Sequence, residues 1–249
     1  MKIEEIDAIS YKNNKASEVK ENVVQDETIT LTINGEISRS LSAIEDSLEE
    51  FAVGYMFNEN LIDSLSSIKE IKIEGPQIFA EIDDRLLKTN ETVLCSDSAG
   101  GWRSKIKEVK EVKSDFQVSV HELISRIEEL KDNAEIWQAT GGTHVAGIVY
   151  DGKFIVKEDV SRHVAVDKVI GYGLLHDFDL SNSYVIYSGR MPADMVIKMT
   201  RVGVPILASN AAPANSGYNI AKKGNVTLVG FLRGERCNVY NNQNRVIFD

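Results

Sequence analysis

The feature that most constrains the fold is the regular alternation of strand and helix patterns in the second half of the chain. The stretch "THVAGIVYDGKFIVKED" (143–159) predicts an apolar hairpin that turns at Asp151-Gly152. Beyond it we expect helices in 162–175, 191–203 and 214–223, separated by strands in 183–189, 204–209 and 225–232, with a short last strand in 245–248. Strands separated by helices of this length are typical of a mostly parallel sheet with helices on both faces.

The first half has a different pattern. Residues 28–41 alternate apolar and polar residues about Asn34-Gly35, which predicts a hairpin with a type I′ turn. An amphipathic helix in 43–62 and two short strands in 68–75 and 77–83 are expected next, and Ser119-x-x-Glu122 begins a capped helix in 119–132. We predict a smaller N-terminal α+β part in 1–115, which contains a mobile loop around Cys95, and an α/β domain in 116–249.

Composition narrows the possible functions. The chain has 249 residues, 43% of them hydrophobic, and no apolar run reaches the length of a membrane helix. Its N-terminus does not resemble a secretory signal, so we expect a cytoplasmic protein without a membrane partner. The net charge of −10 is concentrated in the first half and disfavours nucleic acids as partners. The second half carries basic residues that can lie on a solvated face or receive an anionic small molecule: Arg162, Lys168, Arg190, Lys198, Arg201, Arg233 and Arg236.

Polar residues and glycines gather where strands are expected to end. Ser188, Gly189 and Arg190 lie between a strand and a helix, and Ser209 follows the next strand. In open α/β sheets ligands bind at the carboxyl ends of strands, where backbone N–H groups and helix N-termini attract anions. Gly141-Gly142 before the hairpin can act in the same way.

The histidines and cysteines indicate no metal site. His144 and His163 have no third His or Cys at ligand spacing, so we expect no zinc. His163 can orient a substrate or simply begin a helix, and the sequence leaves both readings open. Of the two cysteines, Cys95 lies in a polar, glycine-containing loop where a thiolate can reach a partner, whereas Cys237 reads as a structural strand residue.

Five blocks in order resemble the FdhD/NarQ family, the sulfurtransferase accessory proteins of molybdenum- or tungsten-dependent formate dehydrogenases. The blocks are "FAVGYMFNENLI", "TGGTHVAGI", "EDVSRHVAVDKVIG", "SGRMPADMVIKMTRVGVPILASNAAPANSG" and "NVTLVGFLRGERCNVY". The resemblance runs from about residue 28 to 240.

The resemblance implies a fold similar to cytidine deaminases without their zinc, that is, a mixed sheet with helices on both faces, and a cytoplasmic homodimer. It implies that sulfur passes as a persulfide from a cysteine desulfurase through Cys95 to the bis-(molybdopterin guanine dinucleotide) cofactor, for an apo-formate dehydrogenase. A GDP-like nucleotide can occupy the same site. Matching motif positions place the cofactor-binding residues at Gly141, Gly142, His144, Arg162, His163, Asp167, Lys168, Ser188, Gly189, Arg190 and Ser209.

One departure from the family pattern leaves alternatives open. The family loop usually carries a CxxC pair, and here Ser98 stands where the second cysteine would be. One thiol can still hold a persulfide, but the chain can instead be a non-catalytic chaperone that binds the cofactor. A nucleotide-modifying enzyme on a deaminase-like scaffold is disfavoured because the sequence lacks the zinc-ligand signature.

Overall fold

The computed structural model of the chain describes residues 2–83, 92–93, 103–104 and 108–248. Its largest element is a six-stranded mixed sheet in the order β11-β10-β12-β13-β14-β15. The strands are β10 (His144–Tyr150), β11 (Lys153–Asp159), β12 (Ser183–Tyr187), β13 (Ile206–Ser209), β14 (Thr227–Arg233) and β15 (Arg236–Tyr240).

The predicted alternation of strands and helices is confirmed, but the sheet is less parallel than the pattern suggests. The β12–β13 and β13–β14 pairs are parallel, whereas the other three pairs are antiparallel. At one edge the β10–β11 hairpin joins the sheet with β10 antiparallel to β12, and at the other edge β15 turns back antiparallel to β14. One of these hairpins turns at Asp151 and Gly152, both with positive φ, as predicted. The other, β14–β15, contains a register shift between Gly230 and Arg233.

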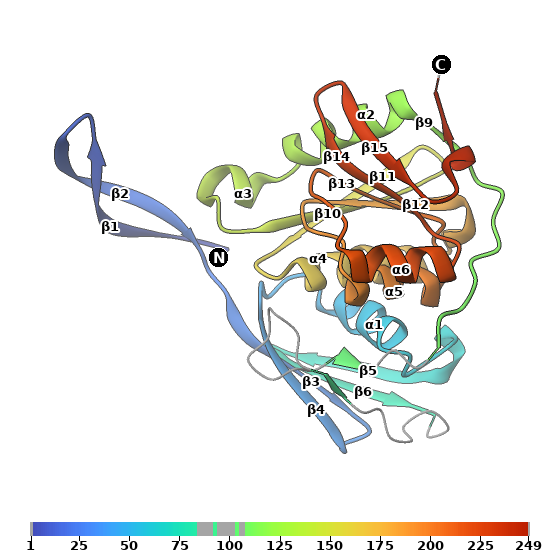
Figure 1. Cartoon of the computed structure of the whole chain (residues 1–249). Helices are drawn as coiled ribbons and strands as arrows, with labels where there is room; N and C mark the ends of the chain where they lie inside the picture. Colours follow the sequence, from blue (N-terminus) through green and yellow to red (C-terminus); the bar gives the residue numbers. More distant parts are fainter. Residues whose placement is uncertain (1, 84–91, 94–102, 105–107, 249) are drawn as a thin grey trace.

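Helices cover both faces of this sheet (Figure 1). On one face lie α4 (Arg162–Leu175), α5 (Ala193–Val202) and α6 (Asn215–Lys223), and on the other lies α2 (Val120–Asp132). Strand β12 shows why its sequence is apolar throughout: Val185 and Tyr187 pack into the α4–α5 side, while Tyr184 and Ile186 pack against α2. Helix α2 begins as predicted, because the Ser119 side chain accepts a hydrogen bond from the Glu122 N–H at 3.0 Å.

A second, four-stranded sheet has the order β4-β3-β6-β5. Its strands are β3 (Glu27–Ile33), β4 (Ile37–Ala43), β5 (Ile68–Glu74) and β6 (Gln77–Ile82). The β3–β4 loop has three residues, Asn34 to Glu36, in place of the predicted two-residue turn. The Asn34 side chain explains the difference, since it accepts from the Ile82 N–H and donates to the Ile82 carbonyl, which ties the turn to β6.

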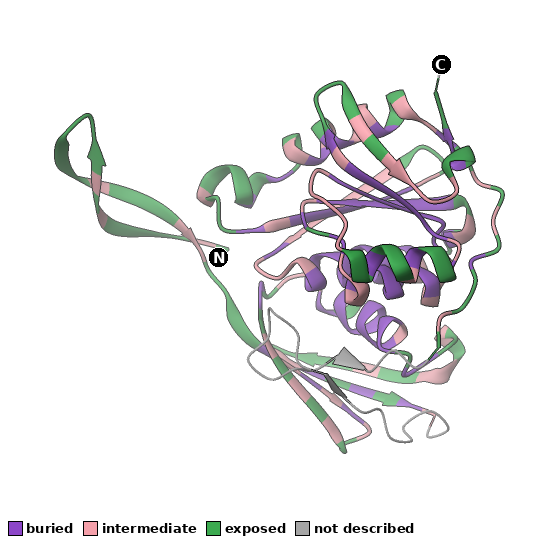
Figure 2. Ribbon diagram, in the orientation of Figure 1, coloured by how far each residue is buried: buried purple, intermediate pink, exposed green. Residues whose placement is uncertain are grey.

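Helix α1 (Leu48–Asn58) lies between the two sheets (Figure 2). It packs on the four-stranded sheet through Phe51 and Met56 and crosses α4 on its other side. Most residues of the helix are therefore buried, and in place of one apolar stripe the helix has buried residues on the two sides that face the small sheet and α4.

The remaining elements are short or lie at the ends of the chain. A hairpin of β1 (Ile3–Lys12) and β2 (Lys15–Val24) precedes the small sheet, in a stretch for which the sequence analysis predicts no strand or helix. Others are β7 (Thr92–Val93), β8 (Arg103–Ser104), β9 (Val118–Ser119), α3 (Glu135–Thr140) and β16 (Val246–Ile247), with 3-10 turns at Leu65–Ser67, Leu180–Asn182 and Gln243–Arg245.

The predicted division at 115/116 falls within a segment that already packs on the large sheet unit. The Val112 N–H donates to the Gly224 carbonyl at 2.9 Å, and the Ser114 hydroxyl donates to the Ser181 carbonyl at 2.5 Å. The packing therefore changes before Val112, and the exact boundary stays a prediction.

Candidate functional site

The candidate site lies at one edge of the six-stranded sheet. Strand β10 begins there at His144, while β12 and β13 end there before Ser188 and Asn210. Helices α4 and α5 also begin at this edge, directly after β11 and the turn that follows β12. The expectation that polar strand ends converge is therefore confirmed for these elements.

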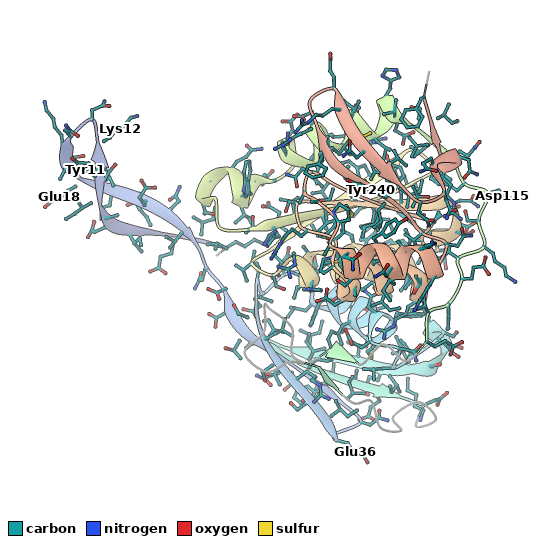
Figure 3. The ribbon with its side chains drawn as sticks, in the orientation of Figure 1. Tyr11, Lys12, Glu18, Glu36, Asp115 and Tyr240 are labelled. Carbon is teal, nitrogen blue, oxygen red and sulfur yellow. The ribbon has the colours of Figure 1, made fainter. Side chains whose placement is uncertain are left out.

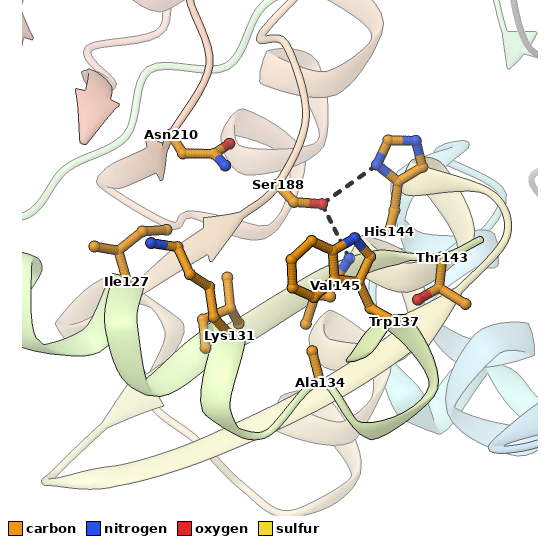
Figure 4. A pocket seen from close by; sticks show the side chains of 10 residues that line it. Ile127, Lys131, Ala134, Trp137, Thr143, His144, Val145, Ser188 and Asn210 are labelled. Atoms are coloured by element: carbon orange, nitrogen blue, oxygen red, sulfur yellow. Dashed lines mark hydrogen bonds between the residues drawn. The ribbon is translucent and has the colours of Figure 1, made fainter. Parts of the chain in front are cut away.

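A cavity of about 230 Å³ opens at this edge (Figure 4). Its floor is apolar, from α2 and the start of β10, and its rim is polar. The residues around it are Ile127, Leu130, Lys131, Ala134, Trp137, Thr143, His144, Val145, Ser188 and Asn210. An apolar floor with a few polar groups at the rim is the usual composition of a small-molecule site.

Ser188 fixes the polar rim between β10 and β12. Its Oγ accepts from the Val145 N–H at 3.0 Å and lies 3.3 Å from the His144 Nδ1 (Figure 4). His144 and Ser188 were both predicted as site residues, and the structure brings them together at the cavity.

Trp137 forms the outer wall of the cavity, and sequence analysis missed it. It lies on α3, a helix of six residues that is too short to show a periodic pattern. The Glu158 carboxylate fixes this helix by accepting from the N–H groups of Ile136 and Trp137 at 2.9 and 2.8 Å. Glu158 also accepts from the Thr143 hydroxyl at 2.8 Å, so one side chain positions both α3 and the start of β10. In the sequence, the acidic residue Glu158 is the signal that could have indicated where α3 and Trp137 lie.

Gly141 and Gly142 join α3 to β10, and each has a specific reason to be glycine. Gly141 has φ of 67° at the end of α3, where glycine is favoured. A Cβ on Gly142 would lie 2.8 Å from the Val24 Cγ1, because the base of the β1–β2 hairpin packs there. Both glycines are exposed beside the cavity.

Gly189, Arg190, Arg162 and Ser209 form a second group on the same edge. A Cβ on Gly189 would lie 3.0 Å from the Arg162 Cδ, so the arginine side chain passes directly over this glycine. The Ser209 hydroxyl donates to the Gly189 carbonyl at 2.6 Å. Arg190 is exposed and Arg162 is half-buried. Two arginine side chains therefore lie at the turn of residues 188–190 that follows β12, called the glycine turn below.

Tyr187 holds the backbone of this turn. Its hydroxyl donates to the Arg190 carbonyl, and burial raises the pKa of Tyr187 well above 10.0. The phenol therefore stays protonated and keeps its role as a donor across the physiological pH range.

The other three predicted residues lie in the interior. His163 is fully buried, with its Nε2 3.3 Å from an Asp194 carboxylate oxygen. The Asp167 carboxylate accepts from Lys198 and from Asn58, each at 2.5 Å. Lys168 donates to Asp159 at 2.8 Å and to the Ile44 carbonyl at 3.1 Å.

The geometry therefore favours a positioning role for Asp167 and Lys168, and their assignment to the ligand-facing set stays a prediction. Two further basic residues named as anion receivers are also engaged inside the fold, since Lys198 pairs with Asp167 and Arg201 donates to the Asn58 carbonyl.

Of the two cysteines, the structure describes only Cys237. Cys95 lies outside the described residues. Cys237 lies on β15, is half-buried, and has its thiol pKa raised by burial. A thiol with a raised pKa is a poor nucleophile at neutral pH.

The described residues contain no group of three or more His, Cys, Asp or Glu side chains that could hold a metal ion. No helix in the part of the chain that is described is long and apolar enough to cross a bilayer.

Comparison with known proteins gives consistent matches over almost the whole chain. The sequence model described as the FdhD/NarQ family matches residues 24–247. A protein of Methanothermobacter thermautotrophicus named sulfur carrier protein FdhD is 44% identical over 244 residues, which cover 98% of both chains. Another of that name, from Shouchella clausii, is 32% identical and covers 90% of this chain and 89% of its own.

A solved structure shows the same fold. It is that of a proposed formate dehydrogenase accessory protein from Desulfotalea psychrophila, with a TM-score of 0.81 and 27% sequence identity. The match covers 98% of this chain and 99% of the other. The mixed α/β fold is thus confirmed, while the likeness to cytidine deaminases stays a prediction.

Proposed function

Because the chain belongs to the FdhD/NarQ family, we propose that it is a sulfur carrier for the maturation of a formate dehydrogenase. The observation that carries this proposal is the 44% identity, over 98% of both chains, to a protein named sulfur carrier protein FdhD. At that identity and coverage the relative and this chain share one architecture from end to end.

In the proposed reaction Cys95 is the carrier. Its thiolate attacks the terminal sulfur of a persulfide on a cysteine desulfurase, a new S–S bond forms at Cys95, and the donor cysteine leaves as a thiolate. The terminal sulfur then passes to the bis-(molybdopterin guanine dinucleotide) cofactor, bound here as substrate, before the cofactor enters the apo-dehydrogenase. In this step the S–S bond at Cys95 breaks, Cys95 is released as a thiolate, and two-electron oxidation of the cofactor's metal supplies the electrons that convert the sulfane sulfur into a sulfide ligand. The raised pKa of Cys237 supports Cys95 as the thiol that carries out this chemistry.

The site edge has the chemistry that such an anionic cofactor needs. Exposed Arg190 and half-buried Arg162 flank the glycine turn after β12, and α4 and α5 begin beside them. Guanidinium groups and helix N-termini both bind phosphates. The neighbouring cavity, with Trp137 as a wall and the polar groups of His144 and Asn210 at its rim, suits a flat heterocycle with hydrogen-bonding edges.

Mass spectrometry tests the carrier role directly. After incubation with a cysteine desulfurase and cysteine, we expect one added sulfur on Cys95 and none in the Cys95→Ser variant. The matched control is Cys237→Ser, which should be persulfidated as the wild type is. Addition at Cys237 alone, or at neither cysteine, would contradict the proposal.

The second candidate function is a non-catalytic chaperone of the cofactor, and Ser98 in place of the family's second cysteine is the observation that favours it. Complementation of a strain without its own accessory protein separates the two. Cys95→Ser should abolish formate dehydrogenase activity if sulfur transfer is the function, whereas a chaperone would keep it.

Titration with GDP tests the binding edge separately from the sulfur chemistry. Arg190→Ala should raise the Kd for GDP about tenfold, because it removes a charge-assisted contact to phosphate. Lys223→Ala removes the same charge at the far end of α6 and serves as the control. Equal Kd values for the two variants would place the nucleotide elsewhere.

A further inference from the structure

Helix α3 projects from the body of the protein, between the six-stranded sheet and the base of the β1–β2 hairpin (Figures 1 and 3). It carries Trp137, which forms the outer wall of the cavity (Figure 4). The helix has only six residues, and an isolated helix of that length is not stable in water. Its structure and its position therefore depend on contacts with other elements.

The first turn of α3 is capped from another strand. The N-cap residue is Ala134, whose side chain cannot accept from the first N–H groups of the helix. The Glu158 carboxylate of β11 takes this role, since it accepts from the N–H groups of Ile136 and Trp137 at 2.9 and 2.8 Å. Among the described residues, these are the only hydrogen bonds that join α3 to the six-stranded sheet.

The other contacts of α3 leave it able to move relative to the sheet. Gln138 donates to the Lys131 and Asp132 carbonyls at 2.7 and 3.0 Å, which ties α3 to the end of α2. At the opposite end of α3, Gly141 has φ of 67°, and a Cβ placed on it would meet nothing within 4 Å. The helix can therefore pivot about these two ends once its bonds to the sheet are released.

The residue that holds α3 is itself fixed in place. Lys157 donates to the Ser47 hydroxyl at 2.7 Å, and Asp159 accepts from the Ile44 N–H at 3.0 Å. Glu158 lies between these two anchored residues at the end of β11. Its carboxylate consequently has a defined position from which to hold a movable helix.

The size of the cavity gives a reason for such movement. Its volume of about 230 Å³ is below the range of about 300–1,000 Å³ that is usual for ligand sites. The floor cannot make room, because Ile127, Leu130 and Val145 are 1%, 2% and 4% exposed in the packed core between α2 and the sheet. Trp137 is 43% exposed, so the α3 side is the one that can give way to a larger ligand.

We propose that Glu158 is a positioning residue that closes α3 over a bound ligand. While its carboxylate accepts from the two N–H groups, Trp137 is held against the cavity. When these bonds break, α3 swings outward, the cavity enlarges, and the ligand can enter or leave. The inference rests on the proposed function for the class of ligand, an anionic cofactor with a nucleotide end, but not for the movement itself.

Fluorescence of Trp137 tests the position of α3 without any ligand. Replacing Trp102 by Phe leaves Trp137 as the only tryptophan of the chain. In this background Glu158→Gln should raise the acrylamide quenching constant about twofold, because a six-residue helix that loses its cap unfolds locally. Glu135→Gln removes the same charge from an exposed position in the first turn of α3 and should leave the constant unchanged. Equal quenching in the two variants would overturn the proposal.

Hydrogen exchange of the unmutated chain gives a test that needs no variant. The amides of Ile136 and Trp137 should exchange about tenfold faster than those of Leu123 and Ile127 in α2, because a local opening costs less than global unfolding. Addition of GDP should slow the exchange of the two α3 amides. Exchange in α3 that is as slow as in α2 would mean that the wall is rigid, which contradicts the proposal.

GDP kinetics test whether α3 retains the ligand. Glu158→Gln should raise the dissociation rate constant of GDP about tenfold and leave the association rate constant nearly unchanged, because changes at a binding site act mainly on dissociation. Glu135→Gln should alter neither constant. An unchanged dissociation rate constant in Glu158→Gln would overturn the closing role. A wild type that binds no GDP would count against the proposed function, whereas quenching and exchange would still decide whether Glu158 positions α3.

Discussion

Asp167 and Lys168 are neighbours on α4, yet each is fully buried with a separate partner of opposite charge. Asp167 pairs with Lys198 of α5, and Lys168 pairs with Asp159 at the end of β11. Such pairs cost desolvation energy, but breaking one leaves a buried charge without compensation. Their geometry fixes where α4 crosses its neighbours, and so where Arg162 lies at the site edge.

The Lys198→Met variant should show this cost. Removing the cation leaves the Asp167 carboxylate buried beside Asn58, and we expect the free energy of unfolding to fall by about 3–5 kcal/mol. Urea denaturation measures the change. The double variant Asp167→Asn/Lys198→Met should recover part of it, and Lys72→Met on the exposed surface should change it by less than about 0.5 kcal/mol. A single variant as stable as the wild type would contradict the role of this pair.

Cys237 gives a prediction that depends on pH. Burial raises the pKa of its thiol above the ordinary 9.0. The thiolate is the reactive form, and a raised pKa means that the folded protein keeps the thiol protonated to higher pH. In the Cys95→Ser variant, the alkylation rate at Cys237 should therefore reach half its maximum above pH 9. The same variant unfolded in urea should show a lower midpoint, and a native midpoint at or below that of the unfolded chain would be inconsistent with the burial effect.

At the scale of elements, the crossing of α1 and α4 depends on two glycines. A Cβ on Gly54 would lie 1.9 Å from the Asp167 carbonyl oxygen, and a Cβ on Gly171 would lie 1.8 Å from that of Glu50. Both obstacles are backbone atoms of the facing helix, which cannot rotate away as a side chain can. The two helices are consequently in backbone contact.

Gly171→Ala should lower the free energy of unfolding by about 3 kcal/mol, at the upper end of what overpacking usually costs. Gly173→Ala is a matched control on the same helix, because the nearest atoms to its Cβ would be the ends of the Ile148 and Leu180 side chains at 3.1 and 3.2 Å, not the backbone of a facing helix. Replacing glycine by alanine raises the helix propensity by a similar amount at both positions. The difference in free energy of unfolding between the two variants therefore measures how much the close α1–α4 crossing contributes. Equal stability of the two variants in thermal unfolding would mean that α1 can move away from α4.

The elements that sequence analysis predicted are those with a strong local signal. The hairpin at Asp151-Gly152 and the capped α2 helix follow from turn and cap chemistry that acts within a few residues. Helix α3 has only six residues and depends on Glu158 from β11, a contact that no local pattern contains. The β1–β2 hairpin was missed for another reason: its faces are mixed, and Asn13-Asn14 is a less familiar type I′ turn than Asn-Gly.

For the candidate site too, the sequence predicts some residues and misses others. Ser188, Gly189 and Arg190 are marked by their place after an expected strand, and His144 by its position in the family motif. All four lie at one edge of the sheet. Asp167 and Lys168 follow the start of α4 by one turn and are assigned to the site only by motif position. Their burial depends in part on contacts with Ile44, Asn58 and Lys198, which are distant in the chain. Trp137 carries no motif and is recognised only from the shape of the cavity.

At the scale of the whole molecule, α1 joins two sheets that the sequence assigns to separate parts. Besides the glycine crossing, polar contacts tie its region to the large sheet unit: the Ile44 N–H donates to Asp159 at 3.0 Å, and Lys157 donates to the Ser47 hydroxyl at 2.7 Å. Because these contacts cross the predicted division, we expect both sheets to unfold together. Far-UV and near-UV circular dichroism of the full chain should give coincident urea transitions.

A chain of residues 108–249 tests this expectation more severely. It keeps Val112 and Ser114 but lacks α1, so the α4 surface around Val164 and Gly171 would face water and Asp159 and Asp167 would lose contacts with Ile44 and Asn58. We expect a shallow urea transition with a lower midpoint and binding of a hydrophobic dye. Co-expression with residues 1–107 should restore the sharp transition, since α1 then returns to its place on α4. If residues 108–249 alone unfolded as sharply as the full chain and at the same urea concentration, the second part would be an independent folding unit, and α1 would be an addition to it rather than part of its core.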